Sequence, residues 1–190
     1  MIADFLAEWL FNMEEQAKLK QIEYIAQFAK AIVKRDVAEM YMPKVYQPVI
    51  EPEDCYLVAV FYEGLEGGKI AYHLVFRDER VPVKQIDERY RKLRLDKYGR
   101  TTDVESIIID LMNLTVIFRS TYASSEPYEL SLHFSAVEPY SFSKGIYVST
   151  WNHMMRVKPS AWVNLRGGYT EIIPEVVEQG RRRKAEKFEV

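Results

Sequence analysis

The first 41 residues carry apolar side chains at helical spacing. Residues 2–41 contain neither glycine nor proline, and they are rich in alanine, leucine, glutamate, glutamine and lysine, which are good helix formers. Acidic side chains such as Asp4 come early and basic ones such as Lys34 and Arg35 come late, which suits the helix dipole. The pattern predicts a single long N-terminal helix.

This helix would present apolar side chains in two opposed directions. With an advance of about 100° per residue, one face carries an early apolar cluster: Ile2, Phe5, Leu6, Trp9, Leu10 and Met13. A face turned by roughly 160° carries a later cluster: Ile22, Ile25, Ala29, Ile32, Val33 and Met40. One straight helix of this span would measure about 60 Å, whereas a globule of this size is roughly 42 Å across.

A single globular body can cover only one of these two faces. Either the helix contains a kink that the sequence does not signal, or it buries opposite faces at its two ends. In the second case we expect a protruding helix and self-association through its early apolar face, with a dimer favoured. The predicted interface consists of Phe5, Leu6, Trp9, Leu10 and Met13.

Two apolar, β-branched and aromatic runs follow a proline-rich connector. The connector spans residues 42–53 and holds three prolines. The runs span residues 55–62 and 69–76, and three glycines lie between them. This arrangement is typical of a β-hairpin.

A central pair of helices is expected next. Residues 81–98 carry apolar side chains at helical spacing, and Gly99 follows as a stop signal. The expected buried stripe consists of Val83, Ile86, Tyr90 and Leu93. The second helix, over residues 102–113, would begin at a capping-box pattern, Thr102-Asp103-Val104-Glu105.

The remaining chain reads as strands joined by short turns. Strands are expected at residues 114–120, 128–137, 145–151 and 153–158, and a last hairpin within 161–173. A short helical turn at 174–179 and a flexible basic tail at 181–190 would complete the chain. The predicted fold is one α+β domain over residues 1–190: a mainly antiparallel sheet of about six strands, the long N-terminal helix (1–41) and the central helical pair.

Composition narrows the class of protein. Hydrophobic residues make up 48% of the chain and charged residues 28%, which indicates a globular protein. The single cysteine, Cys55, excludes an internal disulfide and a multi-cysteine zinc site. No apolar run reaches the roughly 18 residues of a membrane span, and the first residues lack the features of a secretion signal. We expect a cytoplasmic protein with no membrane partner; the scarcity of asparagine and glutamine leans toward a heat-adapted source.

Two basic segments stand out from a net charge of −2. Residues 77–100 have a net charge of +4 and residues 181–190 of +3. Clustered cations can bind phosphates, so nucleic-acid binding through helix 81–98 and tail 181–187 is one hypothesis. The candidate residues are Arg89, Arg91, Lys92, Arg94, Arg181, Arg182, Arg183 and Lys184. The alternative is an ordinary solvated helix face, which the overall pI near 6.0 favours.

Two histidines sit in predicted strands. His73 and His133 both lie opposite the more apolar alternation of their strands, so they could share one face of a sheet and act as acid and base. His133-Phe134-Ser135-Ala136 resembles one half of the signature of two-histidine phosphoesterases, His-x-Ser/Thr-x on facing strands. That resemblance implies a phosphoesterase activity with His73, His133 and Ser135 as candidate residues. The other half departs from the signature, because valine occupies the hydroxyl position in His73-Leu74-Val75-Phe76.

Other chemistry finds little support in the sequence. The glycine-rich stretch before Lys69 lacks the spacing of a phosphate loop, and a strand is expected after it. There is no histidine and carboxylate pattern of metal-binding spacing, so we predict neither a metal nor a cofactor. The leading hypothesis is a non-enzymatic binding or assembly protein that self-associates through residues 2–13. Nucleic-acid binding is the second hypothesis and a two-histidine phosphoesterase the third.

Overall fold

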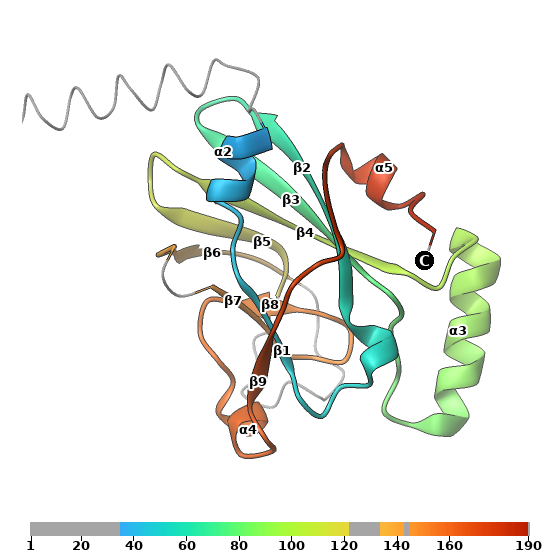
Figure 1. The fold of residues 1–190 in the computed structure, drawn as a ribbon. Helices are drawn as coiled ribbons and strands as arrows, with labels where there is room; N and C mark the ends of the chain where they lie inside the picture. Colours follow the sequence, from blue (N-terminus) through green and yellow to red (C-terminus); the bar gives the residue numbers. More distant parts are fainter. Residues whose placement is uncertain (1–34, 122–133, 143–144, 190) are drawn as a thin grey trace, which may run out of the picture.

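The described part of the protein is built mostly from β-strands. The structure is a computed structural model and describes residues 35–121, 134–142 and 145–189 (Figure 1). These residues form two mixed sheets, one of six strands and one of four. In this part of the chain, no helix is long and apolar enough to cross a membrane.

The larger sheet consists of five consecutive antiparallel strands and a sixth strand that joins one edge in parallel. Its strands in spatial order are β10 (Val176–Gln179), β2 (Leu57–Leu65), β3 (Lys69–Phe76), β4 (Asp103–Asp110), β5 (Thr115–Thr121) and β6 (Phe134–Pro139). β10 joins β2 in parallel, and the other pairs are antiparallel. β5 pairs with β4 only from Ile107 onward, so the first half of β4 has a neighbour on one side only.

The smaller sheet brings together segments that lie far apart in the sequence. Its order is β8 (Met155–Arg156), β7 (Ile146–Val148), β1 (Val45–Pro48) and β9 (Tyr169–Ile172). β1 and β7 are parallel, and the other two pairs are antiparallel.

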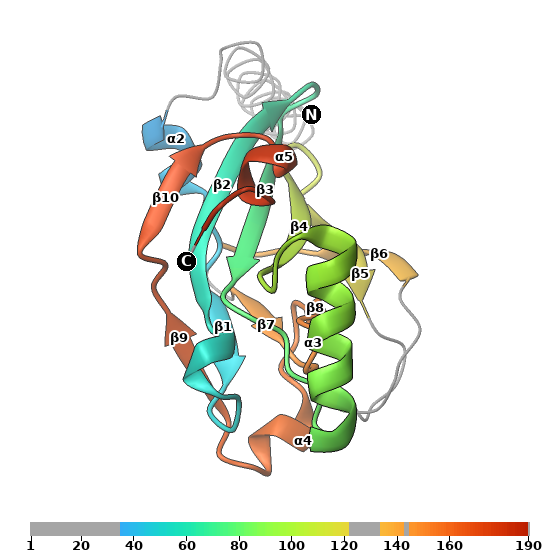
Figure 2. The same ribbon diagram turned by 90° about the vertical axis from the view of Figure 1, so that its right-hand side faces the viewer.

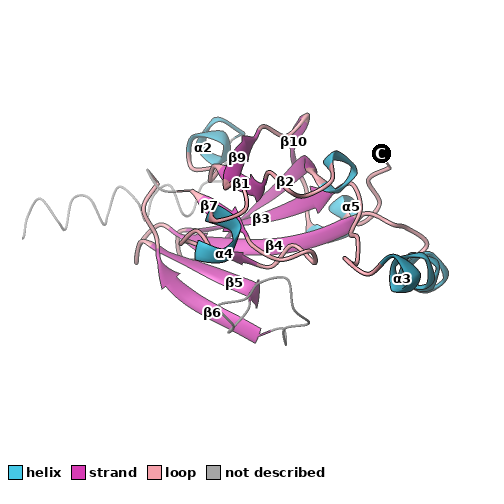
Figure 3. Ribbon diagram, turned by 90° about the horizontal axis from the view of Figure 1, so that it is seen from below, coloured by secondary structure: helices cyan, strands magenta, loops and turns pink. Residues whose placement is uncertain are grey.

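The helices are short, with one exception. They are α2 (Arg35–Met40), the 3₁₀ helix η1 (Glu53–Cys55), α3 (Lys84–Tyr98), α4 (Ala161–Asn164) and α5 (Arg182–Ala185). α3 has 15 residues and stands at the margin of the molecule, beside the sheets rather than between them (Figures 2 and 3). It ends at Gly99, which adopts the left-handed conformation (φ 69°) that glycine permits.

The two sheets share the main apolar core. Tyr62, Ile107 and Phe118 from the larger sheet belong to the same buried cluster as Ile146 and Met155 from the smaller one. A second cluster lies on the other face of the larger sheet, where Ala185 of α5 belongs to it and Phe188, which follows α5, packs against it. Burial of this apolar surface is the main stabilising contribution to such a fold.

The predicted α+β fold is wrong in its main features. Both sheets are mixed, because β10 pairs with β2 and β1 pairs with β7 in parallel. Of the predicted long N-terminal helix, Arg35–Met40 is helical, and residues 2–34 lie outside the described residues. The predicted central pair reduces to α3 alone, because residues 103–110 form β4.

β4 replaces a predicted helix for a clear physical reason. The run Ile107-Ile108-Ile109 is β-branched, and two of its members, Ile107 and Ile109, are fully buried in the core between the sheets. Pairing with β3 along its whole length outweighs the local preference for a helix that a capping-box pattern indicates.

Several local predictions agree with the structure, and others do not. The hairpin expected from residues 55–76 is present as β2 and β3, and the helix expected at 81–98 is present as α3. The helical turn predicted at 174–179 is instead strand β10. The segment predicted as a flexible tail contains α5, whose Ala185 is buried.

Candidate functional site

Helix α3 turns charged side chains, rather than apolar ones, toward the body of the protein. Asp87 and Arg94 are buried, whereas Ile86 and Leu93 are 53% and 60% exposed. The prediction that the apolar residues form the buried stripe of this helix is therefore wrong. The reason is the surface opposite, where acidic side chains such as Asp78 require cations as partners.

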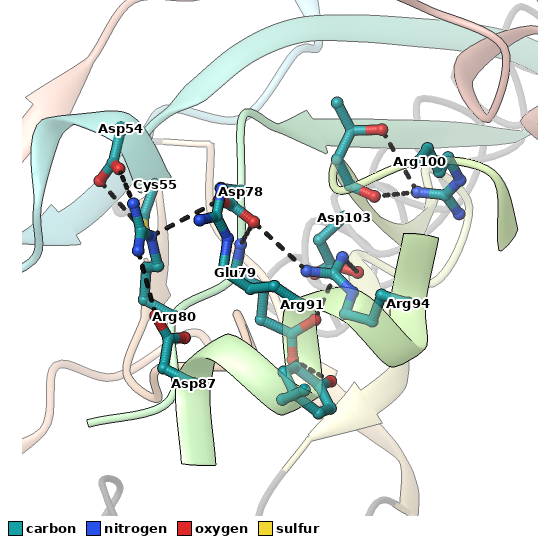
Figure 4. A network of polar contacts seen from close by, with 12 residues as sticks. Asp54, Cys55, Asp78, Glu79, Arg80, Asp87, Arg91, Arg94, Arg100 and Asp103 are labelled. Atoms are coloured by element: carbon teal, nitrogen blue, oxygen red, sulfur yellow. Dashed lines mark hydrogen bonds and ion pairs between the residues drawn. The ribbon is translucent and has the colours of Figure 1, made fainter. Parts of the chain in front are cut away.

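Arg80 holds the N-terminal end of α3 in place. Its guanidinium lies 2.6 Å from the carboxylate of Asp54, 3.0 Å from that of Asp87 and 3.5 Å from that of Asp78 (Figure 4). The backbone N–H of Val81 donates to the other oxygen of Asp87 at 2.9 Å. One arginine thus joins η1, the loop after β3 and the first turn of α3.

Two further arginines continue this ionic cluster along α3. Arg91 lies 2.6 Å from Asp78, and Arg94 lies 3.6 Å from Asp78, 3.3 Å from Glu79 and 3.8 Å from Asp103. Arg94, Asp78 and Glu79 are each less than 10% exposed, so these charges interact with little screening by water.

A buried histidine lies behind the arginines. His153 is fully buried, with Nδ1 2.9 Å from Asp103, Nε2 3.2 Å from Glu51 and its ring stacked on Phe76 at 4.0 Å. Its backbone φ of 54° is uncommon for a residue other than glycine. Burial alone would lower the pKa of His153, but Asp103 and Glu51 outweigh burial and raise this pKa to about 10. The side chain is therefore an imidazolium at neutral pH.

A polar pocket adjoins the cluster, between α3, the start of β4 and α5. It has a volume of about 470 Å³, within the range of small-molecule sites. Its lining residues are Glu79, Tyr90, Arg94, Tyr98, Arg100, Asp103, Val104, Glu105, Asn152, Arg182 and Glu186. The polar lining favours a polar ligand.

Two arginines of the pocket hydrogen-bond to the start of β4 and the residue before it. Arg182 donates to the carbonyl oxygen of Val104 at 2.7 Å, to Oγ of Ser106 at 2.8 Å and to Glu186 at 2.9 Å. Arg100 donates to the carbonyl oxygen of Thr102. The carbonyl groups of Thr102 and Val104 therefore accept hydrogen bonds from guanidinium groups, where in a wider sheet they would accept them from a neighbouring strand.

Arg100 differs from the other two arginines of the pocket in its electrostatic surroundings. Arg94 and Arg182 both form ion pairs, but no carboxylate of the described residues lies within 4.0 Å of the Arg100 guanidinium. Burial lowers the pKa of Arg100. The side chain remains charged at neutral pH, because the pKa of arginine is normally above about 12. Asp103 and Glu186 act on this partly buried cation, but in the described part of the chain neither lies within ion-pair distance of it.

The carboxyl groups of the site have unequal pKa values. Burial, and then the charge of Asp103, raises the pKa of Glu79 to about 7 and raises the pKa of Glu105 well above its usual range. Burial opposes ionisation of Asp103 too, but the hydrogen bond and charge of His153 keep its pKa below the usual value. These directions favour the anionic form of Asp103 and the protonated form of Glu105.

The basic residues predicted to contact nucleic acid fall into two groups. The larger group makes ion pairs within the chain: Arg91, Arg94, Arg181, Arg182 and Lys184. The other three, Arg89, Lys92 and Arg183, are exposed, as are Arg181 and Lys184 of the first group. The charge available to phosphates is therefore smaller than the sequence indicates.

Of the three candidate phosphoesterase residues, the structure describes His73 and Ser135. His73 is buried between Ser106 (Nδ1 to Oγ, 2.9 Å) and Glu63 (Nε2 to Oε1, 3.2 Å), and burial lowers its pKa. Ser135 is exposed and donates to the carbonyl oxygen of Arg119 at 3.5 Å. His133 lies outside the described residues, so its relation to His73 stays a prediction.

The predicted self-association residues also lie outside the described part of the chain; they are Phe5, Leu6, Trp9, Leu10 and Met13. Within residues 35–121, 134–142 and 145–189, no group of three or more His, Cys, Asp or Glu side chains is arranged to hold a metal ion.

Sequence reasoning missed three residues around which the site is organised, namely Glu51, Asp103 and His153. They come from three separate segments, and no motif joins them. The available signal was local: Arg77-Asp78-Glu79-Arg80 combines both signs of charge shortly before a helix, a pattern that indicates ion pairing.

Comparisons with known protein families, curated proteins and solved structures give no match to this chain. The functional argument therefore depends on the geometry of the site.

Proposed function

We propose that this protein binds a small anionic ligand in the pocket between α3, β4 and α5. The observation that carries the proposal is the Arg100 guanidinium, which lines the pocket without a carboxylate partner among the described residues. A buried cation is costly unless an anion accompanies it, and a carboxylate or phosphate group would supply that anion.

The charge balance of the pocket supports an anion rather than a cation. Three arginines, Arg94, Arg100 and Arg182, line the pocket together with the carboxylates of Asp103 and Glu186. Burial, and then the charge of Asp103, raises the pKa of the two other acidic lining residues, Glu79 to about 7 and Glu105 well above its usual range, which favours their neutral forms. The lining therefore leans toward positive charge, which favours an anionic ligand.

The binding reaction can be measured by isothermal titration calorimetry at constant ionic strength, with inorganic phosphate, citrate and adenosine monophosphate as separate probes. We expect saturable binding of at least one probe to the full chain. Arg100→Gln should weaken it about tenfold or more, since a charge-assisted hydrogen bond is lost. Arg89→Gln is the matched control, because Arg89 is exposed on α3 and does not line the pocket.

Three outcomes bear on the proposal. Binding that Arg100→Gln weakens and Arg89→Gln does not would support it. Equal weakening by both variants would show non-specific attraction to positive charge, and no saturable binding of any probe would overturn the proposal. Thermal unfolding of the unliganded variants checks that both are folded.

The other functional hypotheses stay proposals. Self-association is supported by the exposed apolar side chains of α3, namely Val83, Ile86 and Leu93. Nucleic-acid binding has weaker support, because five of its eight candidate cations already pair with carboxylates of the chain. The cytoplasmic location and the heat-adapted source are expectations from composition alone.

A further inference from the structure

One flank of α3 carries a half-exposed apolar stripe. Val83, Ile86 and Leu93 are 47%, 53% and 60% exposed, and Tyr90 shares their spacing. Tyr90 is held by an edge-on contact with Trp151 and by a hydrogen bond to Glu79. Spacings of three, four and three residues place these side chains on one side of a helix, the arrangement by which helices dock on one another.

The exposed charges of α3 are mostly basic. Lys84, Arg89, Lys92 and Lys97 are exposed on α3, against two exposed acidic residues, Glu88 and Asp96. The helix therefore combines an apolar stripe with a net positive exposed surface, and it fits a partner segment that is apolar and acidic.

The chain itself contains such a segment. Its first 17 residues hold four acidic side chains and no basic one. Between the acids lie the apolar residues Ile2, Phe5, Leu6, Trp9, Leu10 and Met13. Ile2, Leu6, Trp9 and Met13 follow spacings of four, three and four residues, which are compatible with the spacing of the α3 stripe.

We propose that the α3 stripe docks residues 2–13 of a second copy of this chain. The inference rests on the proposal of self-association and names the surface that it uses. α2, which follows the N-terminal segment in the sequence, lies at the opposite end of the molecule from α3 (Figures 1 and 2). Reciprocal docking in a two-fold dimer would bury two copies of the same contact.

The experiment measures the mass of the full chain in solution by light scattering over a range of concentrations. Leu93→Asp is the test variant and Leu95→Asp the matched control. Leu95 is 52% exposed and lies two residues away on the other flank of the same helix. We expect a dimer for the wild type and for Leu95→Asp. Leu93→Asp should weaken dimerisation about tenfold or more, because it places a charge in an apolar contact.

A second measurement identifies the occupant. Two differently tagged copies, one with Leu10→Cys and the other with Leu93→Cys, are mixed and oxidised. The native Cys55 is buried and stays in place. A disulfide that joins the two differently tagged chains supports the inference. Cross-linking only within single chains of a Leu10→Cys/Leu93→Cys variant would show that each chain covers its own stripe, and would overturn it.

The remaining outcomes separate this inference from self-association as such. A dimer that Leu6→Asp/Trp9→Asp dissociates but Leu93→Asp does not would overturn the α3 surface and leave self-association standing. A wild type that is monomeric at all concentrations would overturn both. A monomer that binds an oligonucleotide through Arg89 and Lys92 would assign this face to nucleic acid instead.

Discussion

Nδ1 of His153 lies 2.9 Å from a carboxylate oxygen of Asp103, which joins the turn before β8 to the first residue of β4. Both groups are largely inaccessible to water, since His153 is fully buried and the Asp103 side chain is 16% exposed. The pair also separates the core between the sheets from the polar pocket, because Asp103 lines that pocket. The charge states of these residues therefore affect both stability and ligand binding.

The first prediction concerns the charge of His153. Its folded-state pKa is raised to about 10, above the ordinary value of 6.5 for histidine. The imidazolium therefore contributes stability that is fully present below pH 6.5 and is lost as the pH rises through about 10. We expect ring nitrogen chemical shifts in NMR spectra to show a doubly protonated ring at pH 8.

Replacement of this residue extends the test to stability. His153→Gln should lower the free energy of unfolding at neutral pH by roughly 3–5 kcal/mol, because it leaves two buried carboxylates without their cation. The deficit should shrink above pH 10. A His153 ring that titrates near pH 6.5 would show that the Asp103 and Glu51 contacts do not hold in solution.

The second prediction concerns Glu79. Its folded pKa of about 7 is higher than the ordinary value of 4.5 for glutamate, so the folded protein binds more protons than the unfolded chain between these pH values. Stability should therefore fall as the pH rises from 4.5 to 7, and the penalty is complete above that range. Glu79→Gln should remove much of this decrease, on the order of 2 kcal/mol.

Urea denaturation at pH 5.5 and pH 8 measures the effect, with Glu88→Gln as the control. Glu88 is an exposed carboxylate on α3, and its replacement should leave the pH dependence as in the wild type. Identical pH profiles for the wild type and Glu79→Gln would contradict the prediction.

Local features of the fold could be predicted from the sequence. The β2–β3 hairpin follows from two apolar β-branched runs around Gly67 and Gly68, which adopt positive φ angles of 72° in the turn. The end of α3 follows from Gly99 in the same way. In each case the residues that determine the element are adjacent in the sequence.

The failures have a common physical cause. β4 was predicted as a helix because Thr102 and Glu105 match a capping box, but long-range pairing with β3 and burial of Ile107 decide its conformation. The buried face of α3 was predicted from its apolar spacing, whereas acidic groups of the surface opposite select its cations. The sequence alone shows neither that β3 pairs with β4 nor that acidic groups face α3.

The candidate site was predictable only in part. Arg94 and Arg182 were identified as basic residues that could contact phosphates, and both line the pocket. Their convergence with Asp103 and His153 depends on contacts between residues that lie 50 to 78 positions apart. Periodicity and spacing carry no information about such contacts.

The third prediction concerns close backbone packing at Gly145. A Cβ atom at this position would lie 2.6 Å from Cε2 of Tyr46 and 2.8 Å from the carbonyl oxygen of Lys44. Gly67 has a similar positive φ, but nothing lies within 4 Å of a Cβ placed there. Gly67→Ala should cost only the backbone strain, about 1 kcal/mol, and Gly145→Ala should cost about 2–4 kcal/mol.

Thermal or urea unfolding of the two variants provides the comparison. Because both substitutions add one methyl group at a left-handed position, the difference between them isolates the contact with Tyr46. Equal destabilisation would mean that Tyr46 moves aside without cost and that the approach of β1 to the start of β7 is not tight.

The last prediction asks what holds α3 to the body of the protein. Arg94 is 5% exposed and faces the carboxylates of Asp78, Glu79 and Asp103, so Arg94→Met leaves three acidic groups without this cation. The expected loss in the free energy of unfolding is about 3–5 kcal/mol at neutral pH. Arg89→Met, on the exposed side of the same helix, should change the free energy of unfolding by less than about 0.5 kcal/mol.

Arg94 also lowers the pKa of Glu79, so the loss caused by Arg94→Met should be smaller at pH 5, where Glu79 is protonated and one fewer charge needs Arg94. Urea denaturation of both variants at the two pH values separates this account from simple loss of packing, which would cost the same at each pH. A pH-independent deficit for Arg94→Met would indicate that packing of its aliphatic part, rather than its charge, anchors the helix.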